Sequence, residues 1–183
     1  MKNQKLLAIV LAVVLFLFAF FVLYQKNNSL KEFDSPPLSF KYPKEYKDQP
    51  IPKQNKNQAK PLAELRTENS ESMIVFAKEE AAIKGANLLK INFLDFLERN
   101  AEKKFPIVYR GYKKQKIERI KIFGYEVTLM SFGYIGRNNE TRVYVNLFIV
   151  PLTNDAYYLT IQSTNKAKLD HDTRIIQPTV KFK

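Results

Sequence analysis

The chain has 183 residues and a mass of 21.4 kDa, which accommodates one compact domain and an appendage but not two full-sized domains. Apolar residues make up 45% and charged residues 26%, a balance typical of folded chains, and 30 basic against 18 acidic residues give a formal net charge of +12. Because there is no cysteine and one histidine, the sequence excludes a disulfide scaffold, thiolate metal sites, a cysteine nucleophile and a histidine-rich metal site.

The strongest signal is an apolar run without a charge at residues 6–24, which follows a short leader, residues 1–5. A helix of this length measures about 28 Å, close to the hydrocarbon thickness of a bilayer. A cleavable signal peptide is the alternative, but its apolar core is usually shorter, and residues 25–28 offer no small-residue cleavage site. We therefore expect a single-pass transmembrane helix that anchors the protein in the cell membrane, with the amino terminus in the cytoplasm and the carboxy-terminal domain outside it.

A tether and a first group of elements follow the helix. Residues 25–37 are polar and end in two prolines, which predicts a short tether. The alternation in Leu38–Tyr42 and the apolar run Ser72–Ala77 predict strands. Between them, residues 48–70 are rich in Pro, Lys, Asn and Gln, so we expect a long surface excursion there.

Residues 92–103 give the clearest helix signal outside the apolar run. Asn92 can cap the helix, and Pro106 is expected to prevent its continuation. The spacing of its apolar residues produces a single face suited to core packing, formed by Phe93, Phe96, Leu97 and Ala101.

The second half alternates apolar and polar residues over several short segments joined by turns. Short connections favour antiparallel pairing. The expected strands are 116–122, 125–134, 141–150, 156–164 and 179–182, with a helix over 168–176. Residues 38–183 therefore predict an α+β domain, an antiparallel sheet sandwiched by helices.

Several of these segments resemble the PsbP-like fold family. The stretch LSFKYPKEY resembles the family's opening, an aromatic strand that runs into Tyr-Pro and an aromatic residue three places later, here Phe40, Tyr42, Pro43 and Tyr46. A tyrosine replaces the usual tryptophan. The strand opening at Gly124-Tyr125, the strand 157–163 and the closing pattern over 176–182 are similar in order and spacing.

This resemblance covers residues 38–183 and implies a compact α/β/α sandwich. It also implies a class of domains that bind or help assemble other proteins and mostly do not catalyse reactions. No specific function transfers, because function depends on sites rather than on folds.

Few residues suggest chemistry. Asp170, His171 and Asp172 are adjacent, so a helix directs them to different sides, and we expect a solvent-exposed first turn rather than a metal site. The adjacent Glu79 and Glu80 are poor candidates for a catalytic carboxylate pair. The isolated glycines match no phosphate-binding loop. We expect no catalytic residue, no metal and no cofactor, and therefore not an enzyme.

Charge is more informative, because basic residues concentrate between positions 102 and 121. This segment contains eight basic residues but only two acidic residues, Glu102 and Glu118. The basic cluster, our candidate surface for a partner or polyanion, consists of Lys103, Lys104, Arg110, Lys113, Lys114, Lys116, Arg119 and Lys121. A second, sparser basic stretch covers residues 41–60. A solvated charged surface is the alternative interpretation of both.

Two functions remain open at this stage. The first is a membrane-anchored, non-catalytic module that docks onto other envelope proteins. The second is an electrostatic binder that holds anionic lipid head groups or an anionic envelope polymer through the basic cluster. Nucleic acid is not an expected partner, since no recognition motif accompanies the charge.

Overall fold

The computed structural model describes residues 16, 30–51, 59–80, 82–84, 92–136 and 140–183. The leader and, apart from Phe16, the expected transmembrane segment 6–24 lie outside these residues. Within the described ranges, no helix has both the length and the apolar character that a membrane crossing requires.

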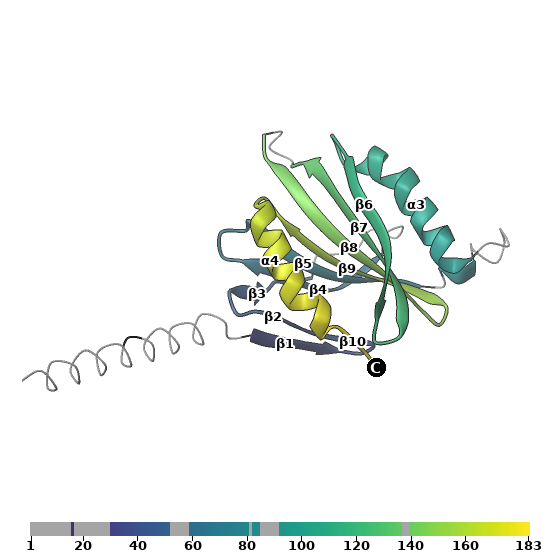
Figure 1. Ribbon diagram of the computed structural model, residues 1–183, viewed down its shortest axis with the longest axis horizontal. Coiled ribbons are helices and arrows are strands. Elements are labelled where there is room, and N and C mark those ends of the chain that lie inside the picture. The colour runs from purple at the N-terminus through teal and green to yellow at the C-terminus, as the bar shows by residue number, and fades with distance from the viewer. Residues whose placement is uncertain (1–15, 17–29, 52–58, 81, 85–91, 137–139) are drawn as a thin grey trace, which may run out of the picture.

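A large antiparallel sheet forms the centre of the domain (Figure 1). Its seven strands follow the order β3-β4-β5-β9-β8-β7-β6. Their bounds are β3 Tyr46–Asp48, β4 Lys60–Thr67, β5 Ser72–Glu79, β6 Lys113–Ile122, β7 Tyr125–Ile135, β8 Arg142–Leu152 and β9 Asp155–Ser163. The pairing of β5 with β9 joins the first and second halves of the chain, and β6 forms one edge.

A smaller sheet contains β1 (Leu30–Ser35), β2 (Leu38–Pro43) and β10 (Lys181–Phe182), in the order β1-β2-β10. The expectation of a tether over residues 25–37 is therefore wrong for 30–35, which pair with β2 along their whole length. The reason is Phe33, whose ring packs on Phe40 at a centroid distance of 5.0 Å and turns a polar segment into part of the domain. The two prolines lie in the connection between the strands.

The expected surface excursion over residues 48–70 is also wrong in part, because residues 60–67 form β4. This strand pairs with β3 on one side and β5 on the other, and its Leu65 is buried. A shift in register between Pro61 and Ala63 interrupts the alternation of side chains. Pairing on both edges rather than local periodicity therefore stabilises this strand.

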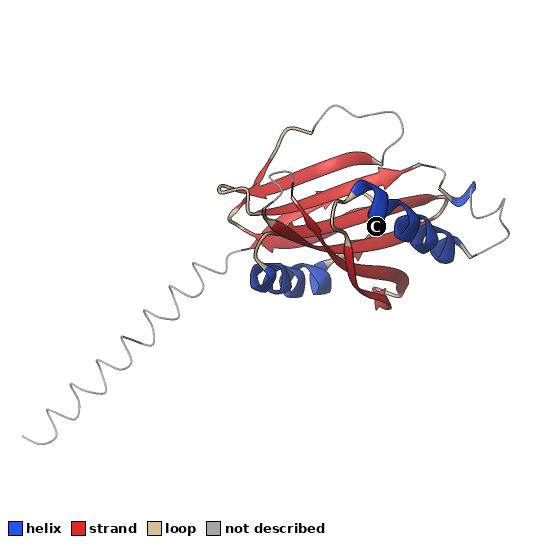
Figure 2. Ribbon diagram, turned by 90° about the horizontal axis from the view of Figure 1, so that it is seen from above, coloured by secondary structure: helices blue, strands red, loops and turns tan. Residues whose placement is uncertain are grey.

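Two helices cover opposite faces of the large sheet. They are α3 (Phe93–Val108) and α4 (Lys166–Ile176), and the 3-10 turn η1 (Gln177–Thr179) follows α4. Side chains of β8 alternate between two cores. Val145, Leu147 and Ile149 pack with α3, whereas Phe148 and Val150 pack with α4. Figure 2 shows the two helices apart, with strands of the sheet between them.

The start of α3 confirms the predicted cap, since the Asn92 side chain accepts a hydrogen bond from the Leu94 backbone N–H at 2.8 Å. The predicted stop at Pro106 is wrong, because the helix continues to Val108. Proline removes one backbone donor, the partner of the Glu102 carbonyl four residues earlier. Glu102 is exposed at this end of the helix, where water can bond to that carbonyl.

The α+β class with an antiparallel sheet and two helices is confirmed.

Candidate functional site

The basic cluster divides between two elements. Lys103 and Lys104 belong to α3, and Arg110 follows that helix. The other five members lie on β6, which has one strand neighbour, β7, in the described part of the chain. Lysine-rich edge strands resist pairing with other chains. Part of the positive charge therefore has a protective role that requires no ligand.

Acidic partners neutralise three members of the cluster. Arg119 pairs with Asp95 and with Glu98, whose Oε1 lies 3.1 Å from its Nε. The hydrogen bond to Glu98 raises the pKa of the Arg119 guanidinium most, and the hydrogen bond to Asp95 raises it further. Both carboxylates come from the first turns of α3, so they become neighbours of Arg119 only through the fold.

Lysines of β6 are paired in the same way. The Lys114 Nζ lies 2.7 Å from Glu102 Oε1, and the Lys116 Nζ lies 2.5 Å from Glu118 Oε2. Four members of the basic cluster form no ion pair with a described residue, namely Lys103, Lys104, Lys113 and Lys121. The structure therefore does not bring the eight residues together as one unpaired surface.

The hairpin between β6 and β7 places an aromatic residue where folding does not favour one. Ile122 pairs with Tyr125, which leaves Phe123 and Gly124 as a two-residue loop with φ values of +48° and +84°. Two positive φ values define a type I′ turn, in which Asn-Gly is the preferred pair. Phe123 is 61% exposed, so packing offsets its unfavourable backbone conformation only in part.

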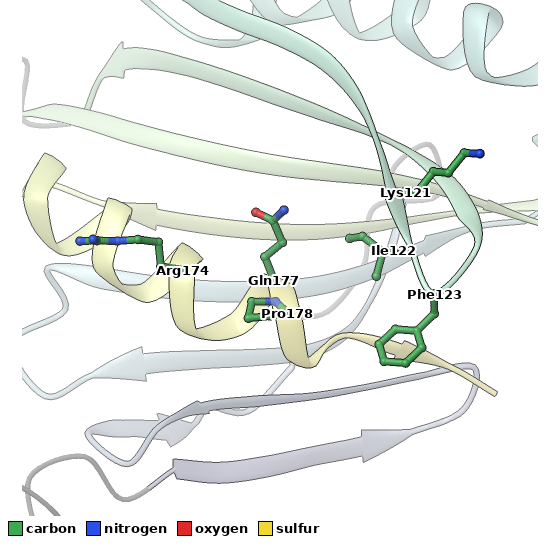
Figure 3. Close-up of a pocket in the computed structure, with 6 residues that line it drawn as sticks. All are labelled: Lys121, Ile122, Phe123, Arg174, Gln177 and Pro178. Carbon is green, nitrogen blue, oxygen red and sulfur yellow. The ribbon is translucent and has the colours of Figure 1, made fainter.

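A hollow of about 440 Å³ lies beside this hairpin (Figure 3). Three apolar residues, Ile122, Phe123 and Pro178, contribute to its lining. The Gln177 side chain extends into the same region, whereas Lys121 and Arg174 extend away from each other at its two ends. Apolar lining residues with a cation on each side suit a partner's apolar side chain flanked by carboxylates.

Aromatic contacts extend this area. Tyr125 is half exposed, and its ring lies edge-on to Phe182 of β10 at a centroid distance of 4.9 Å. We call these residues and those around the hollow the hairpin surface: Lys121, Ile122, Phe123, Tyr125, Arg174, Gln177, Pro178 and Phe182.

Sequence reasoning identified only Lys121 of the hairpin surface. The signal it missed was Phe123-Gly124 between two strand patterns, because an aromatic residue stands where a tight turn prefers asparagine. The contribution of α4 and η1 could not be predicted, since they approach the hairpin only in the folded chain.

Asp172 departs from the expectation of an exposed turn, because it is fully buried. Its Oδ2 accepts a hydrogen bond from the Tyr46 hydroxyl at 2.5 Å and lies 3.3 Å from the Lys168 Nζ. Burial is the main cause that raises the pKa of the Tyr46 hydroxyl, and the hydrogen bond to Asp172 raises it further. These contacts attach α4 to β3, so Asp172 serves the fold.

The neighbours of Asp172 point elsewhere. Asp170 is exposed and pairs with Lys166 at 3.1 Å, and His171 is exposed. Glu79 accepts a hydrogen bond from the Tyr158 hydroxyl at 2.5 Å, while the Glu80 carboxylate lies 3.8 Å from Lys78. In the ranges that the structure covers, no three acidic or histidine side chains are grouped as a metal ion would require.

Comparison with known proteins gives no match to any protein-family model and none to a curated protein. Solved structures do match. The cyanobacterial PsbP protein CyanoP of Synechocystis superposes with a TM-score of 0.51 at 10% identity, covering 85% of this chain and 93% of that one. LpqN of Mycobacterium tuberculosis superposes with a TM-score of 0.50 at 13% identity, covering 86% of this chain and 94% of that one.

The domain has a PsbP-like fold. The residues that carried the resemblance in sequence are core residues of this PsbP-like domain, since Phe40, Tyr42 and Tyr46 are all buried. Identities this low establish the fold alone, because proteins that share a fold often differ in function.

Proposed function

We propose that the protein is a membrane-anchored, non-catalytic binding module that docks onto an envelope protein through the hairpin surface. The observation that carries this proposal is Phe123, an exposed aromatic side chain held at a φ of +48° beside an apolar hollow. A residue that is costly to its own turn and poorly packed has its best explanation in a contact outside the domain.

The position at the membrane rests on the uncharged run at residues 6–24, which would hold the domain outside the cytoplasm. LpqN, which shares the fold, is described as involved in cell envelope biogenesis.

The chemistry of the hairpin surface indicates the kind of partner. Apolar walls between Lys121 and Arg174 favour a segment that presents one apolar side chain between acidic residues. The net charge of +12 would also steer an acidic protein toward the domain. Because the exposed Phe123 ring would contribute an apolar contact, the docking should survive salt that screens the surrounding charges.

Binding of anionic head groups or of an envelope polymer through the whole basic cluster has less support. Lys114, Lys116 and Arg119 already hold carboxylates, so the cluster offers fewer open cations than its sequence indicates.

The test is capture of the full-length protein with its partner from solubilised membranes at low and high salt. Wild-type protein should retain one stoichiometric partner at both salt concentrations, and Phe123→Asn should lose it. Thr153→Gly, which changes the β8–β9 turn at another residue with positive φ, is the matched control and should keep it. A partner that Phe123→Asn retains, or that high salt removes from the wild type, would contradict the proposal.

A further inference from the structure

The carboxy-terminal end of α3 exposes two aliphatic side chains. Ile107 is 85% exposed and Val108 is 69% exposed, whereas the buried residues of this helix lie earlier, at Leu94, Leu97 and Ala101. Side chains that remain in water after folding contribute little hydrophobic stabilisation to the domain. An adjacent pair of them at a helix end is available for a contact outside the chain, and its surroundings decide with what.

Lysines stand on the same faces of the helix as these two side chains. Lys103 precedes Ile107 by four residues, and Lys104 precedes Val108 by four, a spacing that places each pair side by side. Both lysines are exposed, and neither pairs with an acidic residue in the described ranges. We call these four residues the α3 tip.

The charge around the α3 tip is also positive. Arg110 and Lys113 are exposed just beyond the helix end. The nearest acidic residue in sequence, Glu102, is held by Lys114 at 2.7 Å. The tip therefore combines a small apolar projection with positive charge.

We propose that the α3 tip rests on an anionic bilayer surface, with Ile107 and Val108 at the boundary of the acyl chains and the lysines among the head groups. Lysine stems can lie along apolar surface while their ammonium groups stay in the polar layer. Two side chains are too small for a protein interface, because a standard interface buries about 800 Å² in total on each partner.

This inference rests on the membrane position in the proposed function but not on the docking partner. The α3 tip and the hairpin surface lie near opposite ends of β6, a ten-residue strand of roughly 33 Å. Contact of the tip with lipid would thus fix the orientation of the domain while leaving the hairpin surface open to a partner.

The absence of cysteine makes a site-specific test direct. The full-length Ile107→Cys variant would carry a polarity-sensitive fluorophore in vesicles of phosphatidylcholine, alone or mixed equally with phosphatidylglycerol. We expect a blue-shifted emission, quenched by nitroxides on the lipid chains, only in the mixed vesicles. The same label at Phe123→Cys, the control position, should remain in water in both.

Charge reversal tests the role of the lysines. Each lysine near an anionic surface raises the equilibrium constant for contact about fivefold. Lys103→Glu with Lys104→Glu should therefore lower the ratio of membrane-inserted to water-exposed Ile107 label more than tenfold. Lys60→Glu with Lys181→Glu changes the net charge by the same amount at exposed positions elsewhere. This control should leave the ratio unchanged.

Flotation of the vesicles separates this inference from the proposed function. Protein that floats with both vesicle types while the Ile107 label stays in water would overturn the α3 tip contact and leave the anchor intact. Protein that floats with neither would overturn both.

Discussion

Replacement of Phe123 by asparagine separates stability from docking. In the folded hairpin, a φ of +48° costs a non-glycine residue about 1–2 kcal/mol, and asparagine avoids part of that cost. The exposed fraction of 61% leaves roughly 80 Å² covered. At about 25 cal/mol per Å², this covered area contributes at most about 2 kcal/mol, and less when measured against a compact unfolded chain.

These two contributions oppose each other, so the free energy of unfolding of Phe123→Asn should stay within about 1 kcal/mol of the wild type. The assay is urea unfolding of the detergent-solubilised full-length chain, followed by circular dichroism. Phe76→Ala is the comparison, because Phe76 is buried and should cost about 3–5 kcal/mol. A loss in Phe123→Asn as large as that of Phe76→Ala would refute the reasoning, since Phe123 would then be a core residue.

Further predictions concern the fold and the anchor. Tyr46→Phe should lower the free energy of unfolding by about 1–3 kcal/mol in urea titrations, because it removes the hydroxyl that donates to buried Asp172; an unchanged midpoint would contradict this. Burial raises the pKa of Tyr46 and Tyr158, so the folded chain keeps protons that the unfolded chain releases above about pH 10. Stability should be complete below that pH and fall above it by up to about 1.4 kcal/mol per pH unit for each tyrosine, with a smaller slope in Tyr46→Phe. Arg119→Ala should cost at most about 1 kcal/mol in the same titration, because its ion pairs are partly exposed. Deletion of residues 6–24 should release the protein from membranes washed with alkaline carbonate, whereas the full chain should stay.

The architecture was largely predictable because local signals agreed with the final packing. Strands β7, β8 and β9 are rich in aromatic and β-branched residues, and each is joined to the next by a short connection, so pairing follows from sequence order. The helix α3 has both a capping residue and a single apolar face. Such segments need little long-range information.

The missed elements are polar segments whose packing partners the local pattern does not reveal. In the polar strand β1, which pairs with β2, the Phe33 ring packs on Phe40 and Phe76, and β4 is held by pairing on both edges. The sequence around Asp172 predicts an ordinary surface residue, because its hydrogen-bond donor Tyr46 lies 126 positions away. Neither periodicity nor composition carries these relations.

The candidate site was less predictable than the fold for a related reason. The basic cluster is conspicuous in sequence, yet Asp95 and Glu98 of α3 neutralise Arg119 only once helix and strand meet. The hairpin surface combines β6, η1 and β10, which no local pattern connects.

The most direct measurement of the docking proposal is photo-crosslinking in intact cells from position 123. A photoreactive phenylalanine analogue would replace Phe123 in the full-length protein, and the same analogue at Thr153, on the β8–β9 turn, would serve as control. The proposal predicts one crosslinked envelope protein from position 123, with an acidic segment at the crosslinked site, and none from position 153. Equal crosslinking from both positions, or no protein crosslinked from position 123, would contradict docking through the hairpin surface.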